Sequence, residues 1–433
     1  MAVRHWLVEK THCKLFWLLF ANMGGFKRVN TTFINDKSNQ YSTSFRTKQS
    51  RKYDRQEKKM SNEVLEKDKK VEESIADRRI GIDFYKIFCC FLITTIHLFG
   101  YSDFLSIEDI SLANFIVVGG ISSANIVGTS GFVFITGYFL CTKGTQINLR
   151  RIITFVLQLN FVSIAIFGVV GIVNKNFSLS LMIRSFFPIL TQHFWYPFNY
   201  IVLLLMSPVL NIIVQKTTKN ELRRIIILLV SIICVFLKIN PFYNSSIFVG
   251  HYSHSFLWWG LLYLTAAYYR QYGVKHTRLC GVGLFSFSVI MGLLLIFGEK
   301  YFPIISRFGL LEDYSIIGWL ATTSSFIAFH QFKGKVGNTV MRLMKYIVPA
   351  TFIAYILQEH NSVRSMLWEA VNISQYAQMP VYKVMIATVL VFVVIWAAAT
   401  LLYFIYLLAK KIYLDKVAAA FELMIRKIGT FVG

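Results

Sequence analysis

An all-α, polytopic transmembrane helical bundle with about ten spanning helices is the fold that three features of this sequence predict. Hydrophobic residues fill 55% of the 433 positions, and charged residues fill only 15%. The mean hydropathy of +0.53 reflects more apolar surface than one aqueous core could cover. Beyond Ile82 the chain consists of apolar runs separated by short charged loops, which is the pattern of a multi-pass membrane protein.

The amino-terminal segment differs in composition from the rest of the chain. Residues 1–78 are polar, and their second half mixes Lys and Arg with Asp and Glu without apolar periodicity. We expect a solvated or disordered cytoplasmic tail there. Met60 is an alternative start, in which case residues 1–59 reflect the choice of translation start. A membrane domain is predicted over 79–410, and a short basic cytoplasmic tail over 411–433.

Ten apolar runs can be interpreted as membrane spans. The fifth is the weakest, because only residues 225–237 within it are free of charge, whereas the last is unambiguous. The approximate limits are 82–100, 123–142, 151–173, 194–214, 222–240, 252–269, 279–298, 315–332, 345–361 and 384–409.

Alternate loops differ in positive charge, which indicates how the spans are oriented. With the amino-terminal tail inside, the loops on its side hold nineteen Lys and Arg residues and the opposite loops hold seven. Cytoplasmic loops retain positive charge, so both termini are predicted to be cytoplasmic in a cell-membrane protein. The net charge of +23 therefore fits membrane topology, and no nucleic-acid partner is expected.

The sequence lacks the usual signatures of ATP-driven, zinc-protease and serine-hydrolase chemistry. It has no Walker-type loop, no HExxH and no GxSxG, and its six cysteines form no CxxC pair. His251 and His254 are close in sequence, but no third ligand accompanies them, so no metal site is predicted. What remains is a set of ionisable residues inside the spans, where charge is costly and commonly functional.

The first span is the richest in such residues, with the segment RRIGIDFYKIFCCFLITTIHLFG. Around an α-helix Lys86 and His97 differ by about 20°, and Asp83 and Arg79 fall on the same stripe. Along the helix axis His97 lies about 16 Å beyond Lys86. The stripe is either a set of interfacial anchors with a headgroup-level histidine, or a cytoplasmic anion site connected to a proton-handling imidazole.

Other candidates gather near the outer ends of later spans. His193 and Trp195 lie at the outer end of the fourth span, where aromatic residues either form the usual interfacial belt or pack against a sugar ring. Glu359, His360 and Arg364 cluster at the outer end of the ninth span and are candidates for lining an acceptor site.

These segments resemble the membrane-bound acyltransferase-3 family, the integral membrane O-acetyltransferases of bacterial polysaccharides. In that family the first helix carries a basic residue that is followed, after ten other residues, by a His. Here the basic residue is Lys86 and the His is His97. Similar segments follow in order over about 79–410: SGFVFITGYFL at 130–140, the basic pair Arg150 and Arg151, FWYPFNYIVLLLMSPVLN at 194–211 and TFIAYILQEHNSVRSMLW at 351–368.

Two positions depart from the family pattern. Arg150 and Arg151 are adjacent, whereas the family commonly has two Arg residues separated by two positions. Gln358 stands where many members have His, and Glu359 and His360 follow it. The family's donor-binding role therefore does not carry over directly to Arg150 and Arg151, nor does the role of the family's His to Gln358.

The resemblance implies an O-acyltransferase that uses cytoplasmic acetyl-CoA without a metal. His97 would be the general base that takes the proton from a sugar hydroxyl. Asp83 is also predicted to be catalytic, and it would orient Lys86. Cations at the inner end would hold the phosphates of the donor. The residues implied are Lys86, Arg150, Arg151 and Arg79 for the donor, and His193, Trp195, Glu359, His360 and Arg364 for the acceptor.

The implied partners are membrane lipid and a cell-envelope or exported glycan, or a lipid-linked saccharide; the oligomeric state stays open. The alternative function is a proton-coupled transporter or a polysaccharide flippase, which would use the intramembrane charges as a relay. Such proteins commonly show internal repeats or broken helices at matching positions, and neither is clear in this sequence. A sensor or scaffold would leave Lys86 and His97 without a shared purpose.

Overall fold

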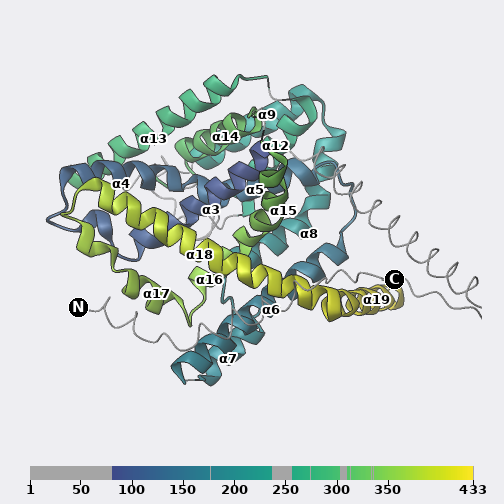
Figure 1. The fold of residues 1–433 in the computed structure, drawn as a ribbon. Helices are drawn as coiled ribbons and strands as arrows, with labels where there is room; N and C mark the ends of the chain where they lie inside the picture. Colours follow the sequence, from purple (N-terminus) through teal and green to yellow (C-terminus); the bar gives the residue numbers. More distant parts are fainter. Residues whose placement is uncertain are drawn as a thin grey trace, which may run out of the picture. The chain divides into compact units, whose positions relative to one another are not determined.

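A computed structural model of the chain describes residues 80–432 except 176, 237–255, 274, 303–309, 313, 333 and 335. Every regular element in this part is helical (Figure 1), which confirms the predicted helical bundle. The predicted tail over 1–78 lies outside the described residues, as do Arg79, His251 and His254.

The helices follow one another with short connections. Two short π-helical turns continue α9 and α18, over Ser231–Phe236 and Lys410–Leu414. The α-helices are α3 (Ile80–Gly100), α4 (Leu112–Asn125), α5 (Val127–Leu140), α6 (Leu149–Asn174), α7 (Leu179–Phe186), α8 (Trp195–Lys216), α9 (Lys219–Val230), α12 (Phe256–Tyr272), α13 (Arg278–Tyr301), α14 (Ile316–His330), α15 (Asn338–Ile347), α16 (Thr351–Glu359), α17 (Arg364–Val371), α18 (Val381–Ala409) and α19 (Asp415–Val432).

Seven stretches of the described chain are long and apolar enough to cross a membrane, so the predicted count of about ten is not confirmed. Three of the predicted spans fall short for different reasons. Helix α9 begins with several charges, α12 has only 17 residues, and α14 is a shorter apolar helix. The seven are Ile80–Gly100, Leu112–Leu140, Leu149–Asn174, Trp195–Lys216, Arg278–Tyr301, Asn338–Glu359 and Val381–Lys427.

Helix α3 occupies the centre of the bundle and packs against α4, α5, α14, α16 and α18 (Figure 1). Its apolar residues point in all directions, as expected of a helix with neighbours on every side. Tyr85, Cys89 and Leu92 are almost completely buried. The hydroxyl of Tyr85 forms a hydrogen bond of 3.1 Å with Ser325 of α14, so even the buried polar atom is satisfied by a neighbouring helix.

Glycines let α5 approach its neighbours closely on two sides. A Cβ atom at Gly131 would collide with the sulfur of Cys89 on α3. A Cβ atom at Gly137 would lie 2.7 Å from the Cα atom of Tyr263 on α12. Small residues at such crossings are the usual means of close helix packing in membranes. They fix α5 between α3 and α12.

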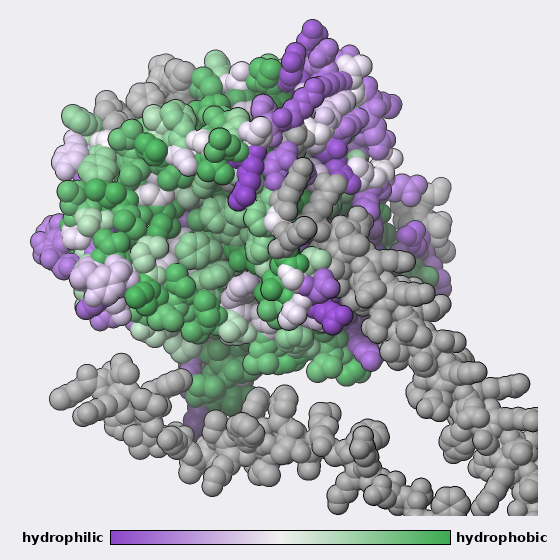
Figure 2. All heavy atoms as spheres, turned by 45° about the horizontal axis from the view of Figure 1, so that its top comes forward, coloured by the Kyte–Doolittle hydropathy of each residue, from purple (hydrophilic) through white to green (hydrophobic). Residues whose placement is uncertain are grey.

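The outer surface of the bundle is apolar, as contact with lipid requires. Figure 2 shows a broad hydrophobic area, with hydrophilic residues gathered mainly towards the upper right and at the left edge. On α18, Leu390, Val394, Leu401 and Leu408 are all more than half exposed. A helix with this exposed apolar face matches the hydrocarbon core of a bilayer, so the protein is a multi-pass membrane protein.

The close approach at Gly137 gives a prediction about stability. Gly137→Ala places a methyl group against the backbone of Tyr263, which cannot move aside as a side chain could, so the helices must separate. We expect destabilisation of about 1–3 kcal/mol, typical of overpacking. The measurement is the unfolding temperature of the detergent-solubilised protein. Gly120→Ala is the control, because a Cβ atom there meets nothing within 4 Å; equal unfolding temperatures for the two variants would contradict the prediction.

Candidate active site

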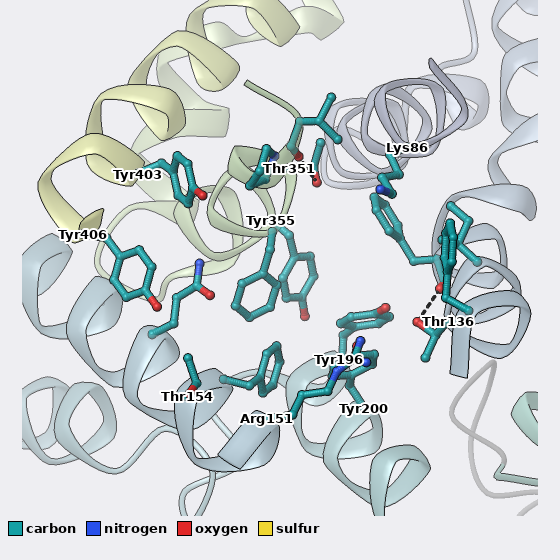
Figure 3. A pocket seen from close by; sticks show the side chains of 18 of the residues that line it. Lys86, Thr136, Arg151, Thr154, Tyr196, Tyr200, Thr351, Tyr355, Tyr403 and Tyr406 are labelled. Carbon is teal, nitrogen blue, oxygen red and sulfur yellow. Dashed lines mark hydrogen bonds between the residues drawn. The ribbon is translucent and has the colours of Figure 1, made fainter. Parts of the chain in front are cut away.

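A cavity of about 530 Å³ lies inside the bundle, between α3, α5, α6, α8, α16 and α18 (Figure 3). Three cationic side chains line it, Lys86 from α3, Arg151 from α6 and Lys410 just after α18. Much of the remaining wall is aromatic, with hydroxyl groups from tyrosine and threonine residues. The cavity can therefore hold a ligand that is anionic in one part and apolar in another.

The cation on α3 is held by a buried carboxylate. Lys86 donates a hydrogen bond of 3.2 Å to Oδ1 of Asp83, three residues earlier on the same helix. Asp83 is only 4% exposed, and a buried charge needs such a partner. Since an ammonium group has three donors, Lys86 can bind an anion in the cavity while it remains paired with Asp83. Asp83 thus fixes the position of the Lys86 ammonium, and its role in catalysis stays a prediction.

The two adjacent arginines have different environments. Arg151 lines the cavity and donates a hydrogen bond of 3.2 Å to the hydroxyl of Tyr200. Arg150 instead donates to the backbone carbonyl of Asp415 at 2.8 Å and pairs with Glu422 at 3.9 Å, both on α19. Successive helix positions differ by about 100°, so adjacent side chains reach different neighbours. Arg151 belongs to the cavity, and Arg150 attaches the carboxy-terminal helix.

Several cavity residues were not singled out from the sequence. Tyr403 and Tyr406 of α18 form one wall together with Lys410, and Figure 3 shows both tyrosines across the cavity from Lys86. Tyr196 of α8 forms another part of the wall. The spacing of Tyr403, Tyr406 and Lys410 by three and four residues puts them on one helix face. The periodicity that linked the ionisable residues of the first span could have identified them.

The cavity ends one helical turn before His97. Along α3 it is lined by Lys86 and Ile93, and along α16 by Thr351 and Tyr355. The next residues on these two faces are His97 and the pair Gln358 and Glu359. The two helices pack against each other, and the rings of His97 and Tyr355 lie 6.4 Å apart. This end of the cavity is thus directed at the imidazole.

His97 and Glu359 form an imidazole–carboxylate pair between α3 and α16. Nε2 of His97 lies 3.3 Å from Oε1 of Glu359. The same carboxylate oxygen accepts a hydrogen bond of 2.7 Å from the hydroxyl of Tyr101. When Nε2 carries the proton donated to Glu359, Nδ1 is left with a lone pair. Nδ1 is buried and has no hydrogen-bond partner among the described residues, so it is the atom available for proton transfer.

Aromatic and cationic groups surround this pair on the side away from the cavity. The ring of Tyr101 stacks on Trp368 at 6.1 Å, and the guanidinium of Arg364 lies 5.5 Å from its centre. Burial and the charge of Glu359 raise the pKa of Tyr101 to about 12, so its hydroxyl stays protonated and donates to Glu359. Tyr101 and Trp368 lie outside the predicted spans, so the helical spacing within the spans did not identify them.

His193 and His360 form a second pair of imidazoles beside the first. Their ring centres are 4.7 Å apart. Nδ1 of His360 accepts from the backbone N–H of Ser362 at 3.2 Å, and Nε2 lies 3.3 Å from the hydroxyl of Ser185. Both nitrogens of His360 are therefore used within the protein, and this side chain connects α7 to the end of α16.

Trp195 is the first residue of α8, and His193 lies just before this helix. The ring of Trp195 packs against Tyr196 at 5.8 Å and joins the hydrophobic core. Nε2 of His193 accepts a long hydrogen bond of 3.4 Å from the backbone N–H of Asn361. Of the residues predicted for the acceptor, Glu359 and Arg364 have the most direct connection to His97.

These features define a multi-pass membrane protein that holds a cluster of cations and an imidazole–carboxylate pair inside one helical bundle. A family model described as an acyltransferase domain matches residues 79–400. The chain therefore belongs to the acyltransferase-3 family, which confirms the resemblance noted in its first helix, and it is a membrane acyltransferase. The searches of curated proteins and of solved structures find no match.

The second imidazole pair gives a prediction about acid stability. Burial, together with the positive charges of Arg184 and Arg364, lowers the pKa of His193 to about 4. An unfolded imidazole titrates near pH 6.5, so between these values the unfolded chain binds more protons and folding stability falls as the pH decreases. We expect His193→Gln to lose less thermal stability than the wild type between pH 7 and pH 5.

The control for this prediction is His276→Gln, because His276 is exposed. The measurement is the unfolding temperature of each protein in detergent across the pH range. An acid-dependent loss that is the same in His193→Gln and in the wild type would show that His193 does not carry the effect.

Proposed function

We propose that this acyltransferase transfers an acetyl group from acetyl-CoA, bound from the cytoplasmic side, to a hydroxyl group of a cell-envelope or exported polysaccharide. The observation that carries the proposal is the cavity that contains three cations and ends one helical turn before the His97–Glu359 pair. Family membership supports acyl transfer and offers no support for the transporter or flippase alternative.

The donor site follows from the charge distribution. Coenzyme A carries several phosphate charges, which Lys86, Arg151 and Lys410 would neutralise in the cavity. The ring faces of Tyr403 and Tyr406 offer stacking surfaces for an adenine base. The excess of Lys and Arg in the loops at this end supports a cytoplasmic position for it, and acetyl-CoA is made in the cytoplasm. The acetyl-bearing arm would extend along α3 towards His97.

The reaction uses the free nitrogen of the imidazole pair. As the oxygen of the acceptor hydroxyl bonds to the thioester carbonyl carbon, its proton passes to Nδ1 of His97. Glu359 stabilises the resulting imidazolium through the Nε2–H group, as the carboxylate of a catalytic triad does. The carbon–sulfur bond then breaks, and the thiolate leaves with the proton from His97. The same imidazole could serve a two-step route through an acyl-enzyme.

The acceptor would approach from the opposite face of the membrane. Arg364 is exposed next to Tyr101, which is itself 46% exposed, so both are accessible beside the His97–Glu359 pair. Aromatic rings pack against the apolar faces of sugars, and a guanidinium binds their hydroxyl or acidic substituents. His360 and His193 would support this surface from within, and Trp195 would fix the start of α8.

The base is tested by His97→Ala in membranes that contain the full chain. We expect the transfer of radiolabel from acetyl-CoA into envelope glycan to fall at least about 100-fold, because general-base catalysis is worth that much or more. His276→Ala, at matched protein levels, is the control because this histidine is exposed. Label transfer that persists in His97→Ala would remove His97 from the mechanism.

The donor site is tested by the two adjacent arginines. Arg151→Gln removes a charge from the cavity, and we expect the KM for acetyl-CoA to rise about tenfold or more, as for a lost charge-assisted hydrogen bond. Arg150→Gln is the matched control: it should leave this KM unchanged, because Arg150 contacts α19. The measurement is initial transfer rate against acetyl-CoA concentration. Equal effects of the two variants would contradict the assignment of the donor site.

A further inference from the structure

Gln358 is a buried amide whose hydrogen-bonding capacity is unused within the described protein. Its side chain is completely buried, yet neither Nε2 nor Oε1 has a hydrogen-bond partner among the described residues. Leaving a buried donor or acceptor unsatisfied costs stability, so such an amide is expected to have a function. The amide lies on the last turn of α16, one helical turn beyond the cavity residue Tyr355.

The surroundings of Gln358 identify the kind of group that it would bind. Gln358 directly precedes Glu359, whose carboxylate lies 3.3 Å from Nε2 of His97, and Nδ1 of this imidazole is also buried without a hydrogen-bond partner among the described residues. Both residues are the next ones along the two helix faces that line the cavity, beyond Ile93 on α3 and Tyr355 on α16. An acyl group carried by the donor would have to extend one helical turn beyond Ile93 and Tyr355, and there it would meet an N–H donor and a proton acceptor together.

We propose that Gln358 is a catalytic residue that stabilises the negatively charged oxygen formed during acyl transfer. This inference rests on the proposed acetyl transfer from acetyl-CoA. Nε2 of Gln358 would donate a hydrogen bond to the carbonyl oxygen of the thioester, while Nδ1 of His97 accepts the proton of the attacking hydroxyl. A neutral amide suits this role, because it provides a donor in a water-excluded site without the cost of burying another charge.

When the acceptor oxygen bonds to the carbonyl carbon, the electron pair of the C=O π bond moves to the carbonyl oxygen. The N–H of Gln358 stabilises this negatively charged oxygen by a hydrogen bond. The proton of the hydroxyl is then on His97. When the C=O bond forms again, the carbon–sulfur bond breaks, and the thiolate takes the proton from His97. The products are an acetyl ester and free coenzyme A, with both protein groups restored.

A purely structural or orienting role gives different expectations. If Gln358 only positioned His97, its removal would change the protonation behaviour of His97 and shift the pH profile of kcat/KM. If it only supported packing, its removal would lower the unfolding temperature. An oxyanion donor, by contrast, should affect kcat alone. Because the amide has no partner in the described protein, an apolar side chain of similar size should leave stability equal or higher.

The experiment compares Gln358→Met, which keeps the size but has no donor, with Gln358→His, which keeps an N–H donor. The full-length protein is purified in detergent, and thiol release from acetyl-CoA is measured with an acceptor glycan. We expect kcat of Gln358→Met to fall about 10²–10³-fold, with the KM for acetyl-CoA, the pH profile and the unfolding temperature maintained. Gln358→His should recover at least part of the lost kcat. Gln375→Met, at an exposed position on the same end of the bundle, is the matched control.

Three outcomes would overturn the inference, and they can be told apart. A wild-type kcat in Gln358→Met would show that the amide is not needed. A fall in kcat accompanied by a shifted pH profile or a lower unfolding temperature would assign Gln358 to positioning or packing. A wild-type protein that transfers no acetyl group from acetyl-CoA would refute the proposed function itself, and the oxyanion role with it.

Discussion

Two ionisable residues on one face of an apolar helix can be buried only if each has a partner. Lys86 pairs with Asp83 within α3, whereas His97 pairs with Glu359 on α16. The second pairing requires α16 to lie along α3 with its last turn at the level of His97. The cavity is bounded by these two helix faces together with α5, α6, α8 and α18, so it ends one helical turn before the imidazole.

Local periodicity predicted a large part of this arrangement. The spacing of Lys86 and His97 put both on one face of the first span, and the structure has Lys86 in a cavity directed at His97. Periodicity could not assign Arg150, because the groups that bind it are on α19, more than 260 residues later. Tyr101 likewise depends on its contact with Glu359, which connects distant parts of the chain. Such pairings depend on tertiary packing, which helical spacing does not encode.

The number of spans was less predictable for a related reason. Hydropathy identifies segments that are apolar enough to contact lipid along their length, but several helices of this bundle contact mainly other helices. Helix α12 is largely buried, so its 17 residues need not match the bilayer thickness. Helix α4 joins α5 to make one apolar stretch of 29 residues, where only its second part was predicted. Short amphipathic helices such as α7 lie between spans and carry no hydropathy signal of their own.

The separation of the cations from the imidazole has a physical consequence for the proposed reaction. Lys86 and His97 are about 16 Å apart along α3. If the phosphates of coenzyme A stay with Lys86, Arg151 and Lys410, only the neutral, flexible arm enters the apolar interior. Moving the phosphates themselves inward would cost several kcal/mol for each charge. The arrangement thus allows an uncharged acetyl group to reach the far side of the bundle while all the charges of the donor remain at its entrance. The orphan amide of Gln358 would then face the one point at which negative charge develops during the reaction.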